Sequence, residues 1–199
     1  PMSKTVMKQD HSRLALRRAG MVLGSLIGSA ALLNSALAST APAPLTSLVG
    51  QQASLLGEGK LRFLGLTVYE ARLWSAAKPE MGKLFDRPLA LELTYRTGLQ
   101  GGTITSTSRD EIERLGLATK PGQIESWESQ MRTIFPNVVS GDRILGVHLP
   151  NRGALFFLND QPIGQVNDAQ FSEAFFNIWL HPETRVASLR KKLLSGLNP

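Results

Sequence analysis

The chain has 199 residues, of which 42% are hydrophobic and 19% charged, with 22 Lys and Arg against 16 Asp and Glu. This composition is globular and excludes collagen, coiled coil and extended disorder. Because the chain contains no cysteine, disulfides, thiolate zinc sites, iron–sulfur clusters and cysteine nucleophiles are excluded as well.

Residues 1–38 have the layout of a secretory signal peptide. Five basic residues precede an uncharged run, 19–38, that ends in Ala36-Leu37-Ala38, and a basic start, an apolar middle and a small-x-small end are typical of such a signal. We predict cleavage after Ala38 and a periplasmic protein; the alternative is a membrane anchor over 19–38, and no other membrane contact is expected. The 161 residues that remain carry 17 basic and 15 acidic side chains, so a nucleic-acid partner is not expected.

The first half of the remaining chain is expected to be mostly strands. Residues 39–54 form an expected leader, extended over 39–50, and the domain is expected to span 55–196. From Leu55 to Trp74, β-branched and apolar residues interrupted by glycines predict two strands. From Leu89 to Thr97, apolar and polar residues alternate, which predicts a half-buried strand.

Two helices and three short strands are expected next. A hydroxyl cap followed by acidic residues predicts a helix that begins near Ser106 or Ser108 and ends at Gly116. Apolar residues at three- and four-residue intervals predict a helix over 122–135. Turn residues then separate three expected strands, which span 144–149, 154–158 and 162–166.

The C-terminal part is expected to be helical. Asp168 is the predicted cap of an amphipathic helix with four apolar residues on one face: Phe171, Phe175, Ile178 and Trp179. A last helix is expected from about Thr184 to Leu194. This order of elements predicts one α+β domain with a mainly antiparallel sheet.

The sequence gives little support for a metal or cofactor enzyme. After residue 38 the histidines are His148 and His181, which stand apart from each other, whereas a metal or catalytic centre needs several converging groups. We expect both to be hydrogen-bonded or surface residues. Nucleophile-elbow, phosphate-loop and zinc-protease motifs are absent, so no metal and no cofactor are expected.

Three polar residues inside apolar stretches are the candidate ligand-binding residues. Arg62 lies between two apolar residues, where a guanidinium group is costly unless it is paired. Tyr69 and Tyr95 each place a hydroxyl at the end of an apolar ring. In an apolar pocket, an arginine can hold a carboxylate by two charge-assisted hydrogen bonds while the walls take a hydrocarbon. The alternative is that Arg62 pairs with Glu58 or Glu70 and that the tyrosines only pack.

Four motifs follow one another over residues 57–194. They are Gly57-Glu-Gly-Lys-Leu-Arg62-Phe-Leu-Gly-Leu-Thr-Val-Tyr69-Glu-Ala-Arg-Leu-Trp74, Phe135-Pro-Asn with Gly141-Asp-Arg143, Asn159-Asp-Gln-Pro-Ile-Gly164, and the run from Phe171 to Leu194. In this order they resemble the chalcone isomerase-like family, and most closely its exported bacterial branch. The resemblance implies an open-faced β-sandwich, in which a large antiparallel sheet is packed with helices on one side.

The resemblance also implies two kinds of function. Chalcone isomerases add a phenolate to an enone within one molecule without a cofactor, and Arg62 matches the arginine that orients their oxyanions. The segment from Gly98 to Ser108, where they carry a catalytic tyrosine, contains none, and Leu64 stands where they carry a threonine; these losses would remove transition-state stabilisation. Fatty-acid-binding members of the superfamily instead use the arginine as a carboxylate anchor. We therefore expect a non-catalytic protein that binds a fatty acid or similar amphiphilic anion, with a chalcone-type isomerase or an envelope protein-interaction module as alternatives.

Overall fold

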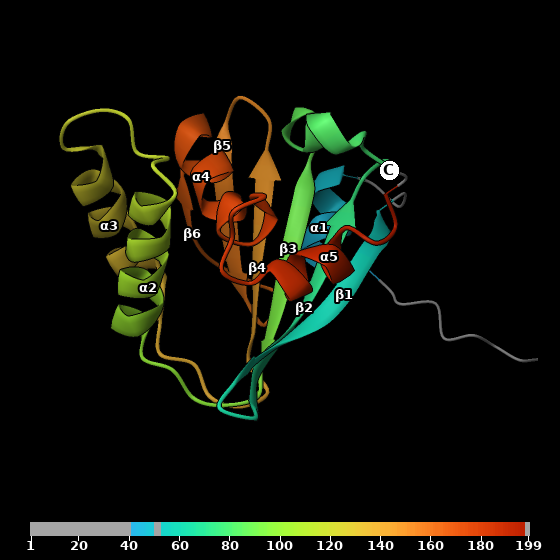
Figure 1. The fold of residues 1–199 in the computed structure, drawn as a ribbon, viewed down its shortest axis with the longest axis horizontal. Helices are drawn as coiled ribbons and strands as arrows, with labels where there is room; N and C mark the ends of the chain where they lie inside the picture. The colour runs from blue at the N-terminus through green and yellow to red at the C-terminus, as the bar shows by residue number, and fades with distance from the viewer. Residues whose placement is uncertain (1–40, 50–52, 198–199) are drawn as a thin grey trace, which may run out of the picture. The chain divides into compact units, whose positions relative to one another are not determined.

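A computed structural model describes residues 41–49 and 53–197, so the expected signal peptide or anchor lies outside the described residues. The strands form a single antiparallel sheet in which each strand pairs with its neighbours in the sequence (Figure 1). This topology confirms the predicted antiparallel sheet. The six strands are β1 (Ser54–Phe63), β2 (Leu66–Ser75), β3 (Leu89–Tyr95), β4 (Arg143–Leu149), β5 (Gly153–Leu158) and β6 (Gln161–Val166).

The helices are α1 (Ala43–Val49), the 3₁₀ helix η1 (Met81–Asp86), α2 (Gly101–Arg114), α3 (Gln123–Ile134), α4 (Ala169–Leu180) and α5 (Ala187–Leu193). Asp168 caps α4 as predicted, because its side chain accepts hydrogen bonds from the backbone N–H groups of Gln170 and Phe171, which lack partners inside the helix. No helix in the described part of the chain combines the length and the apolar character needed to cross a bilayer.

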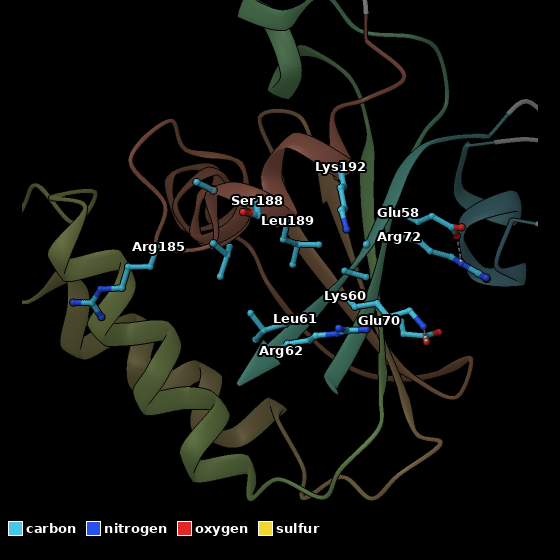
Figure 2. Close-up of a pocket in the computed structure, with 14 residues that line it drawn as sticks. Glu58, Lys60, Leu61, Arg62, Glu70, Arg72, Arg185, Ser188, Leu189 and Lys192 are labelled. Carbon is cyan, nitrogen blue, oxygen red and sulfur yellow. Dashed lines mark hydrogen bonds and ion pairs between the residues drawn. The ribbon is translucent and has the colours of Figure 1, made fainter. Parts of the chain in front are cut away.

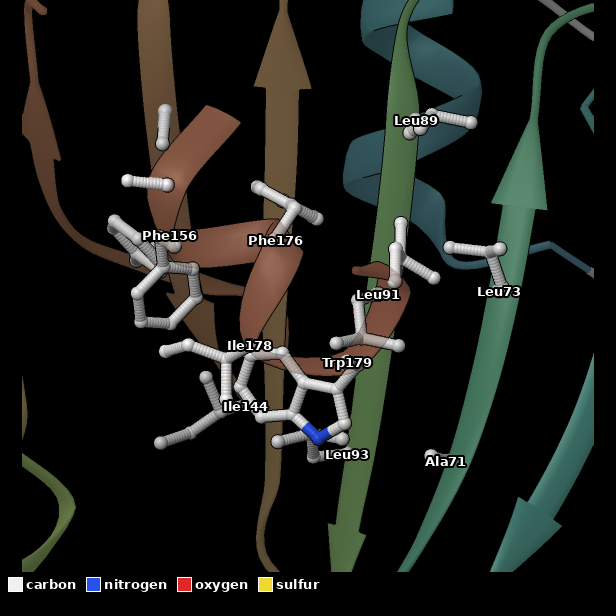
Figure 3. Packing of buried hydrophobic residues seen from close by; sticks show 14 of the residues in the cluster. Ala71, Leu73, Leu89, Leu91, Leu93, Ile144, Phe156, Phe176, Ile178 and Trp179 are labelled. Atoms are coloured by element: carbon white, nitrogen blue, oxygen red, sulfur yellow. The ribbon is translucent and has the colours of Figure 1, made fainter. Parts of the chain in front are cut away.

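The two faces of the sheet pack against different helices, because successive side chains of a strand point to opposite sides. On one face, Leu93 and Ile144 of the sheet lie in one buried cluster with Ile178 and Trp179 of α4 (Figure 3). On the other face, a smaller cluster joins five buried residues: Leu45 of α1, Trp74, Ala90, Leu145 and Val147. The main core therefore lies between one face of the sheet and the helices α2, α3, α4 and α5.

Two helices differ from the prediction: α1 was not expected, and α2 begins earlier than expected. Part of the expected extended leader is the helix α1, because Leu45 is fully buried against the sheet. The helix α2 begins at Gly101 rather than near Ser106. Its first N–H donates to Asn137 Oδ1 at 2.9 Å, and a Cβ at Gly101 would lie 2.1 Å from the carbonyl oxygen of Phe135. The start of α2 is therefore set by a distant loop and not by a local hydroxyl cap.

Glycines let the last helix pack closely on the first strand. A Cβ at Gly57 would lie 2.1 Å from the carbonyl oxygen of Lys192, and one at Gly59 would lie 2.7 Å from Leu189 Cδ1. After α5, the backbone N–H of Gly196 donates to the carbonyl oxygen of Leu56 at 2.7 Å. The C-terminal segment thus covers β1, which is an edge strand of the sheet.

Candidate functional site

An apolar cavity of about 660 Å³ lies between the sheet and the helices α2 and α4. This volume is within the roughly 300–1,000 Å³ of small-molecule pockets. The sheet, the β1–β2 hairpin, both helices and the α4–α5 connection all contribute to its wall. The apolar part of the wall consists of Leu61, Phe63, Val68, Leu93, Leu99, Ile104, Phe135, Ile144, Phe175, Ile178, Trp179 and Val186.

Both predicted tyrosines line this cavity. Tyr69 and Tyr95 are direct cross-strand partners on β2 and β3, and their rings meet edge to face with centroids 5.9 Å apart. The Tyr69 hydroxyl accepts a hydrogen bond from Trp179 Nε1 at 2.9 Å. The Tyr95 hydroxyl forms no hydrogen bond within the described residues, so it is available to a ligand.

Both tyrosines are protonated at neutral pH, and burial raises the pKa of each hydroxyl further. It raises the pKa of Tyr69 to about 12, against a smaller lowering by the hydrogen bond from Trp179. It also raises the pKa of Tyr95, with a further contribution from Tyr69. A protonated phenol donates one hydrogen bond, so the pair presents two donors to an oxygen-bearing group in the cavity.

Arg62 lies outside the apolar cavity. It is exposed, and it lines a separate polar hollow between β1, β2 and α5, which Figure 2 shows. Its neighbours Leu61 and Phe63 both line the apolar cavity, but Arg62 does not. The prediction of a buried Arg62 beside the tyrosines is therefore wrong.

The expected ion pairs of Arg62 are not formed either. Glu58 pairs with Arg72 at 3.0 Å, and Glu70 pairs with Lys60 at 2.7 Å and with Arg96 at 2.8 Å. Within the described part of the chain, Arg62 has no hydrogen bond and no ion pair. Both carboxylates proposed as its partners are thus occupied by other cations.

The arginine that does line the apolar cavity is Arg185, in the connection between α4 and α5. Arg185 Nη1 donates to Glu111 Oε1 at 2.6 Å, and Arg114 donates to Glu111 Oε2 from Nε at 3.0 Å and from Nη2 at 2.8 Å. The buried Glu111 carboxylate is therefore shared by two guanidinium groups. Sequence analysis missed Arg185, because it lies 74 residues from Glu111 and no local pattern marks it.

The segment that corresponds to the site of the catalytic tyrosine in chalcone isomerases does line the cavity, but with other side chains. Thr103, Thr107 and Ser108 contribute hydroxyls from α2, and that of Ser108 donates to the carbonyl oxygen of Ile104 at 2.8 Å. Leu64, which stands in the place of a threonine, is 87% exposed in the β1–β2 turn. The cavity therefore lacks both hydroxyls that the resemblance associates with catalysis.

The two histidines are hydrogen-bonded, as expected. His148 is fully buried, with Nδ1 2.7 Å from Ser172 Oγ and Nε2 3.0 Å from the carbonyl oxygen of Phe85, and burial lowers its pKa. His181 Nδ1 accepts from the backbone N–H of Glu183 at 3.0 Å. No cluster of three or more His, Asp or Glu side chains suited to a metal ion occurs in the described residues.

Comparison with known proteins agrees with this architecture. The model of the chalcone isomerase-like family matches residues 36–195, which begins before the expected domain start at 55. An uncharacterized protein of Haemophilus influenzae is 36% identical over 109 residues, which cover 55% of this chain and 52% of that protein, so the match spans about half of the relative's length. The crystal structure of a fatty-acid binding protein of Arabidopsis thaliana shares the fold, with a TM-score of 0.54 and 14% identity over 73% of this chain and 88% of that one. With its open sheet, its helical cover and a family match over most of its length, the chain belongs to the chalcone isomerase-like family.

Proposed function

We propose that the protein binds a fatty acid or a similar amphiphilic anion in the apolar cavity and does not transform it. The observation that carries this proposal is the composition of the cavity wall, which is almost entirely apolar apart from two protonated tyrosines, a few hydroxyls and the Glu111–Arg185 pair at one side. Each methylene of a ligand that leaves water for such a wall contributes about 0.8 kcal/mol. The hydrocarbon thus supplies the affinity, and the polar groups orient the acid.

The lack of a tyrosine in the α2 segment supports binding rather than catalysis, whereas the outward position of Arg62 removes an arginine that the resemblance assigns to both functions. The arginine that matches the oxyanion-orienting residue of chalcone isomerases points out of the cavity, and the α2 segment brings no tyrosine. An isomerase needs donors fixed where negative charge develops, and neither Arg62 nor a tyrosine of α2 is among the residues that line the cavity. A fatty-acid binding protein of Arabidopsis thaliana with the same fold also supports this proposal.

A fluorescence titration with a brominated fatty acid tests the proposal, because bromine quenches tryptophan at short range and Trp179 lines the cavity. We expect saturable quenching, which Trp179→Phe removes even though Trp74 and Trp127 remain. Absence of saturable quenching in the unmodified protein, together with absence of copurified lipid in native mass spectrometry, refutes the proposal.

Two arginine variants form a matched pair that locates the acid group. Arg185→Ala is expected to weaken binding about three- to tenfold, which is the low end for a charge-assisted hydrogen bond because the side chain is 66% exposed. Arg62→Ala is expected to leave the affinity unchanged. The opposite result, a loss with Arg62→Ala alone, would instead assign the anchor to the arginine that the sequence resemblance indicates.

We further propose that the protein is exported and that it acts in the periplasm. The support is the sequence of residues 1–38, with its basic start, uncharged middle and Ala36-Leu37-Ala38 end. Mass spectrometry of the protein from a periplasmic extract is expected to show a chain that begins at Ser39. A full-length chain in the membrane fraction would favour the anchor over 19–38 instead.

A further inference from the structure

The turn between β1 and β2 exposes the most apolar surface of the described chain. Among its large hydrophobic residues, the three most exposed are Leu64 at 87%, Leu66 at 75% and Phe63 at 69%. We call residues 63–66 the hairpin tip. Val139, at 65%, lies in a loop at the same end of the sheet, because the backbone N–H of Gly141 donates to the carbonyl oxygen of Tyr95, the last residue of β3. Four exposed apolar side chains therefore lie at one end of the sheet.

The conformation of the hairpin tip makes Leu64 doubly unfavourable. Leu64 and Gly65 have φ of 48° and 82°, and a two-residue turn with both φ angles positive is of type I′, for which Asn-Gly is preferred. A leucine in the left-handed region costs about 1–2 kcal/mol, and its side chain is also exposed to water. No contact within the described chain compensates these two penalties, which points to a partner outside it.

The hairpin tip adjoins both the apolar cavity and a set of cations. Phe63 is 69% exposed and also lines the cavity, so it lies at the cavity opening. At the base of the tip, Arg62 is exposed and has no ion pair in the described chain, while Lys60 shares Glu70 with Arg96. An apolar tip beside excess positive charge is the pattern of a segment that inserts into an anionic bilayer surface.

We propose that the hairpin tip inserts into the headgroup region of an anionic membrane and turns the cavity opening toward the lipid. Lipid suits this surface better than protein, because one short turn offers far less than the about 800 Å² per partner of a standard protein interface. Insertion of the hairpin tip does not depend on the proposed function. Passage of an amphiphile from the membrane into the cavity, in contrast, rests on the proposed function. This membrane contact is distinct from the alternative anchor over residues 19–38.

Binding to vesicles tests the insertion, with the protein as isolated from an expressing cell. Leu64→Asn and Leu66→Thr are each expected to lower the partition coefficient on phosphatidylglycerol vesicles about tenfold, because each removes most of one leucine from the lipid. Arg62→Gln is expected to lower it about fivefold on phosphatidylglycerol and not on phosphatidylcholine. The N-terminus is processed alike in every variant, so its contribution cancels in these ratios.

Met81→Asn is the matched control. Met81 is exposed on η1, which lies at the end of the sheet away from the hairpin tip (Figure 1), so its substitution is expected to leave vesicle binding unchanged. Because asparagine suits the type I′ turn, Leu64→Asn is also expected to keep or raise the free energy of unfolding. Its loss of vesicle binding therefore does not arise from misfolding.

Several results separate the proposals. Equal binding of Leu64→Asn and the unmodified protein, or an equal loss with Met81→Asn, overturns insertion of the hairpin tip. Self-association in sedimentation that Leu64→Asn abolishes overturns it as well, because it assigns the tip to a second copy of the chain. Saturable quenching by the brominated fatty acid without vesicles is expected to survive in Leu64→Asn. If quenching is absent but the vesicle results hold, the proposed function fails and the membrane contact stands.

Discussion

Removal of the Tyr69 hydroxyl tests the hydrogen bond between the sheet and α4. In Tyr69→Phe, Trp179 Nε1 loses its acceptor, which lies 2.9 Å away in a buried position. An unsatisfied buried donor costs about 1–3 kcal/mol. We expect the free energy of unfolding in urea to fall by this amount, with an unchanged m-value because the fold and its buried surface are preserved.

Tyr95→Phe is the control for this substitution. Tyr95 lies directly across from Tyr69 on the next strand and is equally buried, but its hydroxyl has no hydrogen-bond partner in the described chain. The same chemical change is therefore expected to alter the free energy of unfolding by no more than about 0.5 kcal/mol. Equal losses in the two variants would refute the assignment of the stability to the Trp179 hydrogen bond.

The dependence of stability on high pH gives a second measurement of the same residue. Burial raises the pKa of Tyr69 from 10.0 to about 12, so between these values the unfolded chain releases a proton that the folded chain retains. The contribution of the protonated Tyr69 hydroxyl to the free energy of unfolding is complete below pH 10 and is lost as the pH rises to about 12. A shift of this size corresponds to about 2–3 kcal/mol at most. Unfolding of Tyr69→Phe is expected to depend less steeply on pH in this window, and an unchanged slope would contradict the raised pKa.

Two further predictions concern packing and low pH. Gly57→Ala is expected to lower the free energy of unfolding by at least about 1–3 kcal/mol, because its Cβ would overlap the α5 backbone. The control is Gly102→Ala, whose Cβ would meet no atom within 4 Å. If both variants lose the same free energy of unfolding in urea, close packing of α5 on β1 is contradicted. Because burial lowers the pKa of His148 below 6.5, the unfolded chain takes up a proton first as the pH falls, so stability is expected to decline below about pH 6.5. In His148→Gln, the free energy of unfolding in urea is expected not to show this decline below about pH 6.5. A decline as steep as that of the unmodified protein would contradict the lowered pKa of His148.

The elements that the sequence predicted well are those with a regular apolar pattern. The strand β3 and the helices α3 and α4 have such patterns, and their bounds lie within about two residues of the predicted ones. The prediction that β3 is half-buried is wrong, because side chains on both of its faces are buried. The helix α1 and the start of α2 escaped prediction because tertiary contacts set them, namely burial of Leu45 and the hydrogen bond from the Gly101 N–H to Asn137. No pattern within a short window carries that information.

The direction of Arg62 was unpredictable for a different reason. Apolar residues pack on both faces of this sheet, against Leu45 on one side and against α4 on the other, so alternation alone does not tell which side faces the cavity. The pairing of β1 with β2 also shifts its register between Leu61 and Arg62, and such a shift redirects side chains. The two tyrosines both line the cavity, and the pairing of β2 with β3 that brings them together is regular.

The cover of β1 by the C-terminal segment has a consequence for folding. Strands β1 to β6 can pair one after another, since each neighbour in the sheet is also the next strand in the chain. The first strand nevertheless stays uncovered until Leu189, Leu193 and Gly196 pack on it, and these residues follow all six strands in the sequence. The strand that comes first in the sequence is therefore covered last, and until then its backbone groups are open to pairing with another chain.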